Sequence, residues 1–185
     1  MGAFYLTLIA VLLSGVASRD QITIAALTSR QGQRLGVLVT AMLVAALTCA
    51  AAAYLADEVL RTLPPPARSI LAAIVLAFAG AESLILSPRK TPREPTHSLG
   101  ALAIVLLASQ VTDAARFSLF GIAVGTGAPL AAGLGGGLAG LVLVGVAWGF
   151  PQVFAGQAVR IVRRVVGGLL LIAAITMFMA RRGML

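Results

Sequence analysis

The stretch that decides the fold is residues 98–124, which read SLGALAIVLLASQVTDAARFSLFGIAV. It is long and apolar enough to cross a bilayer, which needs roughly 20 apolar residues, but Gln110, Asp113 and Arg116 interrupt it. A carboxylate at the centre of a span costs roughly 2.5–3.5 kcal/mol on insertion scales. Other polar groups must offset that cost, so the stretch is predicted to be both a membrane span and part of a functional site.

The composition of the whole chain agrees with a lipid environment. Of its 185 residues, 59% are hydrophobic and 11% are charged, whereas an ordinary soluble domain has about 25% charged residues. A soluble enzyme, a disordered chain and a disulfide scaffold are therefore excluded, and the lipid bilayer is the expected surrounding.

Six apolar runs predict an all-α, polytopic membrane protein with six transmembrane helices. The runs cover residues 3–27, 35–56, 69–87, 98–124, 130–150 and 161–180. Residues 88–97 contain three prolines and charges of both signs, which is typical of a linker. We therefore expect two three-helix units, 1–87 and 98–185, joined by a cytoplasmic linker at 88–97.

The basic residues predict the orientation. The net charge is +8, but no basic stripe with interleaved aromatic residues points to nucleic acid. The loops after the first, third and fifth runs carry eight Lys and Arg, and the opposite side carries four. The eight are Arg30, Arg34, Arg89, Lys90, Arg93, Arg160, Arg163 and Arg164, and the four are Arg61, Arg68, Arg181 and Arg182. The positive-inside rule then places both termini outside a bacterial-type inner (plasma) membrane.

The two halves of the chain register with each other at an offset of 95 residues. The matched pairs are Ile9 and Ile104, Leu12 and Leu107, Ser14 and Ser109, Val16 and Val111, Gly32 and Gly127, and Arg68 and Arg163. The polar interruptions of the first and fourth runs coincide as well, with Ser18 on Asp113 and Gln21 on Arg116. Because each half has three spans, the second half must enter the membrane from the other side. This predicts two inverted three-helix repeats, in which a substrate site lies near the bilayer midplane beside interrupted helices.

The interruption of the fourth run has two interpretations. Gln110, Asp113 and Arg116 are three residues apart and would share one face of a continuous helix, where they could line an ion path. Alternatively, Asp113 and Arg116 form a neutral pair that is merely tolerated inside the bundle.

The interruption of the first run is formed by Ser18, Arg19, Asp20 and Gln21. Arg19 and Asp20 are adjacent and cannot both line one cavity unless the helix unwinds there. If it unwinds, the freed carbonyl groups become cation ligands. If it does not, Arg19 snorkels to an interface or pairs with Asp113. For Glu82, near the end of the third run, we expect a solvated helix end.

Several other motifs have structural interpretations. Residues 135–140 match G-x-G-x-x-G, but no strand precedes them, so we expect close helix packing at Gly136 and Gly140 rather than a nucleotide site. Cys49 is expected to be a small packing residue, and Trp148 an interface anchor. No cysteine–histidine cluster or nucleophile–base pair is visible in the sequence, so we predict neither an enzyme nor a cofactor.

The segment 4–27 (FYLTLIAVLLSGVASRDQITIAAL), the repeat, the arginine–glycine loop and the short span after Leu63-Pro64 resemble the Gdt family of calcium/manganese–proton exchangers, also called the transmembrane protein 165 family. The resemblance implies two inverted three-helix halves, each with a motif E-x-G-D-[KR]-[ST], often followed by Gln. It also implies that the four motif carboxylates bind the cation and exchange it for protons.

The motifs of this chain depart from that pattern. In the first half, Gly15 stands where Glu is expected and Ser18 where Asp is expected, while Arg19 and Gln21 fit. In the second half, only Asp113 matches an acidic position, and Gln110 replaces Glu. One of the four expected carboxylates remains.

The loss of carboxylates predicts a weakened cation site. The remaining candidate ligands for a small inorganic cation and protons are Asp113, Gln110, Ser18 and Asp20, with Thr112 as a further source of oxygen. A dication about 6 Å from an unpaired arginine would feel about 5–6 kcal/mol of repulsion at an effective dielectric constant near 20.

We therefore expect an integral membrane secondary transporter resembling cation–proton antiporters, with Asp113 as the coupling residue. Two alternatives stay open. One is a non-transporting protein that kept the scaffold, and the other is an exporter of another small solute, such as an amino acid or an anion drawn to Arg19 or Arg116. Assembly into a homo-oligomer also stays open.

Overall fold

The computed structural model describes residues 1–85 and 97–181, and these residues form an all-α fold. The helices are α1 (Gly2–Gly15), α2 (Arg19–Gln31), α3 (Leu35–Thr62), α4 (Pro65–Ile85), α5 (Leu99–Val111), α6 (Ala114–Thr126), α7 (Pro129–Gly149), the short 3₁₀ helix η1 (Pro151–Ala155) and α8 (Gln157–Arg181). Of the predicted linker 88–97, only His97 is among the described residues. The division into units 1–87 and 98–185 therefore stays a prediction.

Four single helices are long and apolar enough to cross a membrane, namely α3, α4, α7 and α8. Two further candidates are bent pairs. The axes of α1 and α2 differ by 59° and those of α5 and α6 by 51°, so the described chain has up to six spans if each pair counts as one. The predicted interruptions of the first and fourth runs are thereby confirmed as breaks in the helix.

Proline and glycine mark the helix ends. Pro65 and Pro66 lie in the first turn of α4 and Pro129 in the first turn of α7, where the missing N–H of proline leaves no helical hydrogen bond unmade. Gly32 follows α2 with φ +77°, and Gly127 follows α6 with φ +66°. Glycine adopts a positive φ without steric cost. Both matched positions of the repeat therefore follow a helix with a positive φ, although ψ is 176° at Gly32 and 23° at Gly127.

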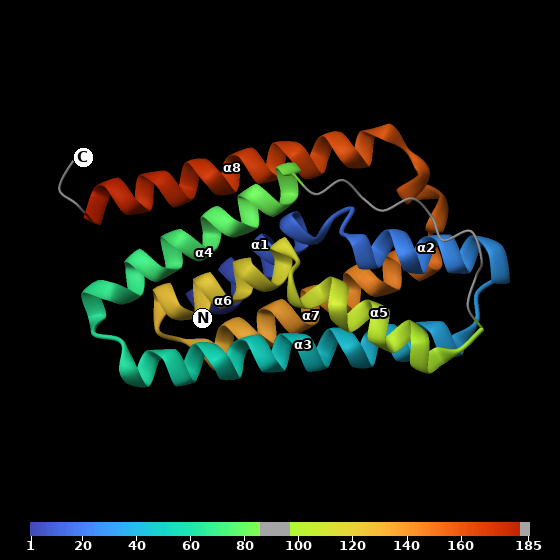
Figure 1. Ribbon diagram of the computed structural model, residues 1–185, viewed down its shortest axis with the longest axis horizontal. Coiled ribbons are helices and arrows are strands. Elements are labelled where there is room, and N and C mark those ends of the chain that lie inside the picture. The colour runs from blue at the N-terminus through green and yellow to red at the C-terminus, as the bar shows by residue number, and fades with distance from the viewer. Residues whose placement is uncertain (86–96, 182–185) are drawn as a thin grey trace.

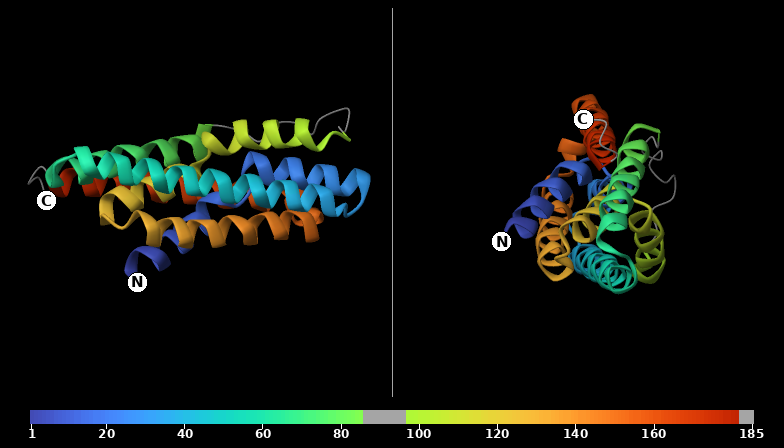
Figure 2. Two further views of the ribbon diagram at one scale, coloured as in Figure 1. Left: turned by 90° about the horizontal axis from the view of Figure 1, so that it is seen from below. Right: turned by 90° about the vertical axis from the view of Figure 1, so that its left-hand side faces the viewer.

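The helices pack into one elongated bundle. In Figure 1, α4 and α8 lie side by side and run in opposite directions, as do α3 and α7. The pair α1–α2 also runs opposite to the pair α5–α6. The end-on view in Figure 2 places α6 at the centre, where it packs against α1, α3, α4 and α7.

The outer faces of the helices are apolar. Large exposed side chains follow one another along α3 and α8, among them Leu35, Val39, Leu43, Leu47, Ile161, Val165, Leu169 and Ile172. A soluble monomer rarely exposes so continuous an apolar surface. The described structure is therefore that of a protein whose long helices are suited to a membrane.

Small residues bring helix backbones into contact. A Cβ placed on Gly80 of α4 would lie 2.8 Å from the carbonyl oxygen of Gly167 on α8. A Cβ on Gly136 of α7 would lie 2.4 Å from Leu119, whereas one on Gly140 would meet nothing closer than 3.7 Å. The predicted close approach is thus confirmed at Gly136 but not at Gly140. Cys49 is buried against apolar neighbours, as predicted.

Candidate functional site

The two helix breaks are closed by the same backbone hydrogen bond. The amide of Ser18 donates to the carbonyl of Gly15 at 3.1 Å, and the amide of Asp113 donates to the carbonyl of Gln110 at 3.2 Å. Both pairs are related by the offset of 95 residues. The breaks thus fall at equivalent positions of the two halves, but the turns differ, because Ala17 has φ +59° and its equivalent Thr112 has φ −106°.

The side chains at the two breaks cap the following helices differently. Asp113 is the N-cap of α6, and its Oδ2 accepts from the amide of Ala115 at 3.3 Å. Ser18 does not cap α2. Its hydroxyl donates to Oδ1 of Asp20, which also accepts from the amide of Gln21 at 2.9 Å. The second break therefore has a charged cap, and the first does not.

A first group of buried contacts joins the two breaks through Gln110. Its Nε2 donates to Oδ2 of Asp20 at 2.8 Å. Its Oε1 accepts from Thr48 Oγ1 at 2.8 Å and from Arg116 Nη2 at 2.9 Å. Arg116 Nε also donates to Thr48 at 3.0 Å. The amide of Gln110 thus connects the carboxylate of one half with the guanidinium of the other.

A second group is centred on Glu82 of α4. Arg163 Nη2 of α8 lies 2.5 Å from Glu82 Oε2 and 3.8 Å from Asp113 Oδ1. Arg19 Nε lies 3.7 Å from Glu82 Oε1. The contact between Gly80 and Gly167 holds α4 and α8 close enough for the pair of Glu82 and Arg163 to form.

Two arginines also bind the backbone at the breaks. Arg163 Nη1 donates to the carbonyl oxygen of Ala17 at 2.9 Å. Arg19 Nη2 lies 3.2 Å from the carbonyl oxygen of Thr112 and 2.7 Å from its hydroxyl oxygen. Both freed carbonyl groups, at equivalent positions of the repeat, accept hydrogen bonds from guanidinium groups.

We call these side chains the polar cluster: Arg19, Asp20, Thr48, Glu82, Gln110, Asp113, Arg116 and Arg163. Its three carboxylates and three guanidinium groups give a formal charge of zero. Within the described residues, four atoms of the cluster and one atom of the adjacent Gln21 are buried without a hydrogen-bond partner: Arg19 Nε, Arg163 Nε, Glu82 Oε1, Asp113 Oδ1 and Gln21 Nε2.

Three of the four predicted ligands are joined by side-chain hydrogen bonds, and the fourth, Asp113, lies in the same polar cluster. Asp20, Gln110 and Ser18 are connected by hydrogen bonds. Asp113 instead faces Arg163. Among the described residues, no group of three or more His, Cys, Asp or Glu side chains is arranged to hold a metal ion.

Both interpretations of the side chains in the fourth run are wrong in their geometry, and so is the expectation that Glu82 is solvated. Because the helix breaks before Asp113, Gln110, Asp113 and Arg116 do not lie on one continuous helix, and Arg116 bonds to Thr48 and Gln110 rather than to Asp113. Glu82 is 7% exposed and paired, not solvated.

The sequence did not reveal Arg163 and Thr48 as members of the cluster. The sequence places Arg163 among the eight basic loop residues on the predicted cytoplasmic side, but its side chain is buried and 3% exposed. Without Arg163, seven basic residues remain on that side, against four on the other. Its neighbours Arg160 and Arg164 are exposed. The sequence feature that sets Arg163 apart from its neighbours is its match with Arg68 in the repeat.

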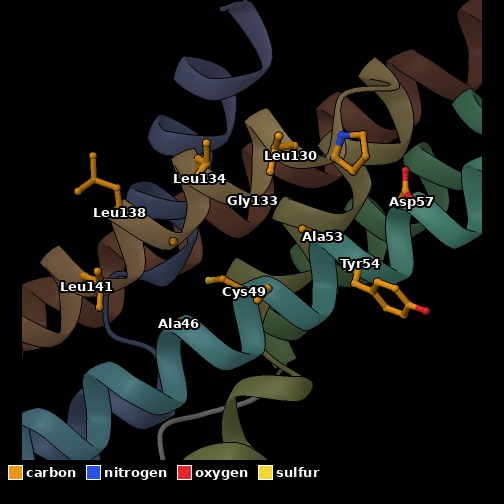
Figure 3. A pocket seen from close by; sticks show the side chains of 13 residues that line it. Ala46, Cys49, Ala53, Tyr54, Asp57, Leu130, Gly133, Leu134, Leu138 and Leu141 are labelled. Atoms are coloured by element: carbon orange, nitrogen blue, oxygen red, sulfur yellow. The ribbon is translucent and has the colours of Figure 1, made fainter.

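A separate apolar groove of about 690 Å³ lies between α3 and α7. Figure 3 shows it lined by small residues and leucines, with Tyr54 and Asp57 at one end. Asp57 is paired with Arg61 at 2.7 Å. No member of the polar cluster lines this groove, so the charged site and the groove are distinct.

No family model, no curated protein and no solved structure matches this chain. The fold and the site therefore define it by themselves. It is an all-α protein with helices long and apolar enough for several membrane spans, and a buried polar cluster joins its two broken helices.

Proposed function

We propose that the chain is an ion-coupled secondary transporter whose substrate site is the polar cluster. The observation that carries this proposal is the meeting of two equivalent helix breaks at a buried, charged cluster. Charged residues inside membrane proteins are expensive to bury and generally mark ion or substrate pathways. Discontinuous helices at the interface of two repeats are the usual construction of a transport site.

We further propose that the two halves are inverted repeats with six spans, on the scaffold that the Gdt family resemblance implies. The opposite directions of α3 and α7, and of α4 and α8, support this proposal. So does the match of Gly32 with Gly127, which end equivalent helices. Both termini would then lie outside and the linker in the cytoplasm.

The cluster is poorly suited to a tightly bound divalent cation. Glu82 and Asp113 lie beside Arg163, and Asp20 already accepts from Gln110. Hard cations require several oxygen ligands at once, and here these oxygens are shared with arginines. The broader class of ion-coupled transporter therefore fits the geometry better than calcium or manganese exchange does.

The test is ion flux in liposomes containing the purified protein. A pH gradient should drive saturable ion movement, and Asp113→Asn should reduce it at least about tenfold. Asparagine is a good N-cap, so this variant should keep the start of α6. Asp57→Asn, at the exposed end of α3, is the matched control and should transport like the wild type. Absence of flux for every ion tested would instead support a non-transporting scaffold.

A further inference from the structure

We propose that the polar cluster binds a small monovalent inorganic anion between Arg163, Arg19 and Gln21, and that the anion crosses the membrane with a proton carried on Glu82. The transport part of this proposal rests on the proposed function. The binding part does not.

The first ground is a set of unused donors at the first helix break. Arg163 Nε, Arg19 Nε and Gln21 Nε2 are buried N–H groups without a hydrogen-bond partner among the described residues. A buried donor without a partner is costly, so such donors indicate a place for a ligand. An anion satisfies donors, whereas a metal cation would be repelled by them.

The second ground is that two of these side chains, Gln21 and Arg163, meet at Ala17. Gln21 Oε1 accepts from the amide of Ala17 at 2.9 Å, and Arg163 Nη1 donates to the carbonyl of Ala17 at 2.9 Å. Arg19 follows two positions later and begins α2. The N-terminus of this helix has the positive end of its dipole, but Asp20 in the first turn already accepts from the amide of Gln21. The donors left for an anion are therefore the side-chain N–H groups of Arg163, Arg19 and Gln21.

The formal charge of zero on the cluster explains why a proton must accompany the anion. With equal numbers of carboxylates and guanidinium groups, an added anion would leave a buried net charge of −1, which is strongly unfavourable. Uptake of one proton removes that charge. Glu82 is the proposed acceptor because it contacts both arginines that would bind the anion, and its Oε1 has no hydrogen-bond partner among the described residues. The charged groups around it are Arg163 of α8 and Arg19 of α2, with Asp113 beyond Arg163.

The size of the ligand follows from the spacing of the charges. Glu82 lies 2.5 Å from Arg163 and 3.7 Å from Arg19. An anion that enters between these groups must be small, such as a halide or the planar nitrate ion. A larger anion such as gluconate would not fit without separating α4 from α8.

Binding is tested by thermal unfolding of the detergent-solubilised protein. We expect sodium chloride, bromide or nitrate to raise Tm by on the order of 3 °C relative to sodium gluconate at equal ionic strength. Two matched double variants make the test specific. Glu82→Gln with Arg163→Gln removes one buried ion pair, and Asp57→Asn with Arg61→Gln removes one exposed pair. The first should lose the rise and the second should keep it.

A variant without added charge tests the donor of Gln21. Gln21→Met keeps a side chain of similar length but removes Nε2, together with the oxygen that accepts from the amide of Ala17. It should weaken anion binding at least about tenfold while the protein still folds. Anion binding as tight as in the wild type would overturn the assigned site. A bromide-soaked crystal should show anomalous density beside Arg163 Nε, and density only elsewhere would also overturn it.

Flux measurements in liposomes distinguish the proposed anion site from the broader proposal of an ion-coupled transporter. In liposomes, an inward proton gradient should drive uptake of chloride, bromide or nitrate. Flux of calcium or manganese without anion binding would overturn the inference but keep the transporter proposal. Neither binding nor flux of any tested ion would overturn both.

Discussion

Arg163 on α8 donates from Nη1 to the carbonyl oxygen of Ala17, at 2.9 Å and across 146 positions of sequence. At the equivalent position of the other half, Arg19 Nη2 lies 3.2 Å from the carbonyl oxygen of Thr112. The sequence predicted that unwound carbonyl groups would be cation ligands. In the structure each is occupied by a guanidinium group from the other half of the chain. The breaks are therefore stabilised by arginine, and the same contacts connect the two halves.

Removal of the charge of Arg163 should destabilise the protein strongly. Arg163→Met leaves Glu82 buried beside Arg19 at 3.7 Å, without its closest partner. Loss of one partner of a buried ion pair costs about 3–5 kcal/mol. Adding Glu82→Gln to this variant should recover most of that loss in denaturant unfolding. A single variant as stable as the wild type would contradict the assigned pairing.

Widening the contact between α4 and α8 should disturb the cluster without any change of charge. Gly80→Ala places a Cβ 2.8 Å from the carbonyl oxygen of Gly167. Overpacking of this kind costs about 1–3 kcal/mol. The matched control is Gly168→Ala, where a Cβ meets nothing within 4 Å. The control should be neutral or slightly stabilising, because alanine is the better helix former. Equal unfolding free energies for the two variants would refute the close contact.

Removal of the Thr48 hydroxyl should lower the stability of the protein more than the small size of this group suggests. Thr48→Val keeps the shape of the side chain but removes the hydroxyl that donates to Gln110 and accepts from Arg116. Unsatisfied buried groups cost about 1–3 kcal/mol, so we expect a loss of stability in that range. Thr176→Val, at an exposed position of α8, should have little effect in the same unfolding assay. An equally small effect at Thr48 would count against the hydrogen-bond assignment.

The proposed topology predicts labelling from opposite sides of the membrane. In a Cys49→Ala background, cysteines can replace Thr62 at the end of α3 and Ser98 before α5, both of which are exposed. A membrane-impermeant maleimide applied from outside should label Thr62→Cys in intact cells. Ser98→Cys should react only after the membrane is opened. Labelling of both sites from the same side would exclude the inverted arrangement.

Local signals in the sequence were sufficient for the helices and their interruptions. Apolar runs, prolines at helix starts and matched glycines after α2 and α6 act over a few residues. The polar residues near Ser18 and Asp113 therefore marked the places where both helices break, although the side chains of the fourth run were interpreted on a continuous helix. Distant partners leave no such local pattern, which is why Glu82 was expected to be solvated and why Arg163 was counted as a loop charge.

By itself, the sequence determined that the chain forms long apolar helices and that polar residues interrupt two of them at equivalent positions. Only the tertiary structure decided which charges meet at those breaks. The physical reason is the packing of α4 against α8 at Gly80 and Gly167, which places Glu82 beside Arg163 and brings Arg163 to Ala17. Helix-forming tendency is a property of short segments, whereas the pairing of buried charges depends on how whole helices approach one another.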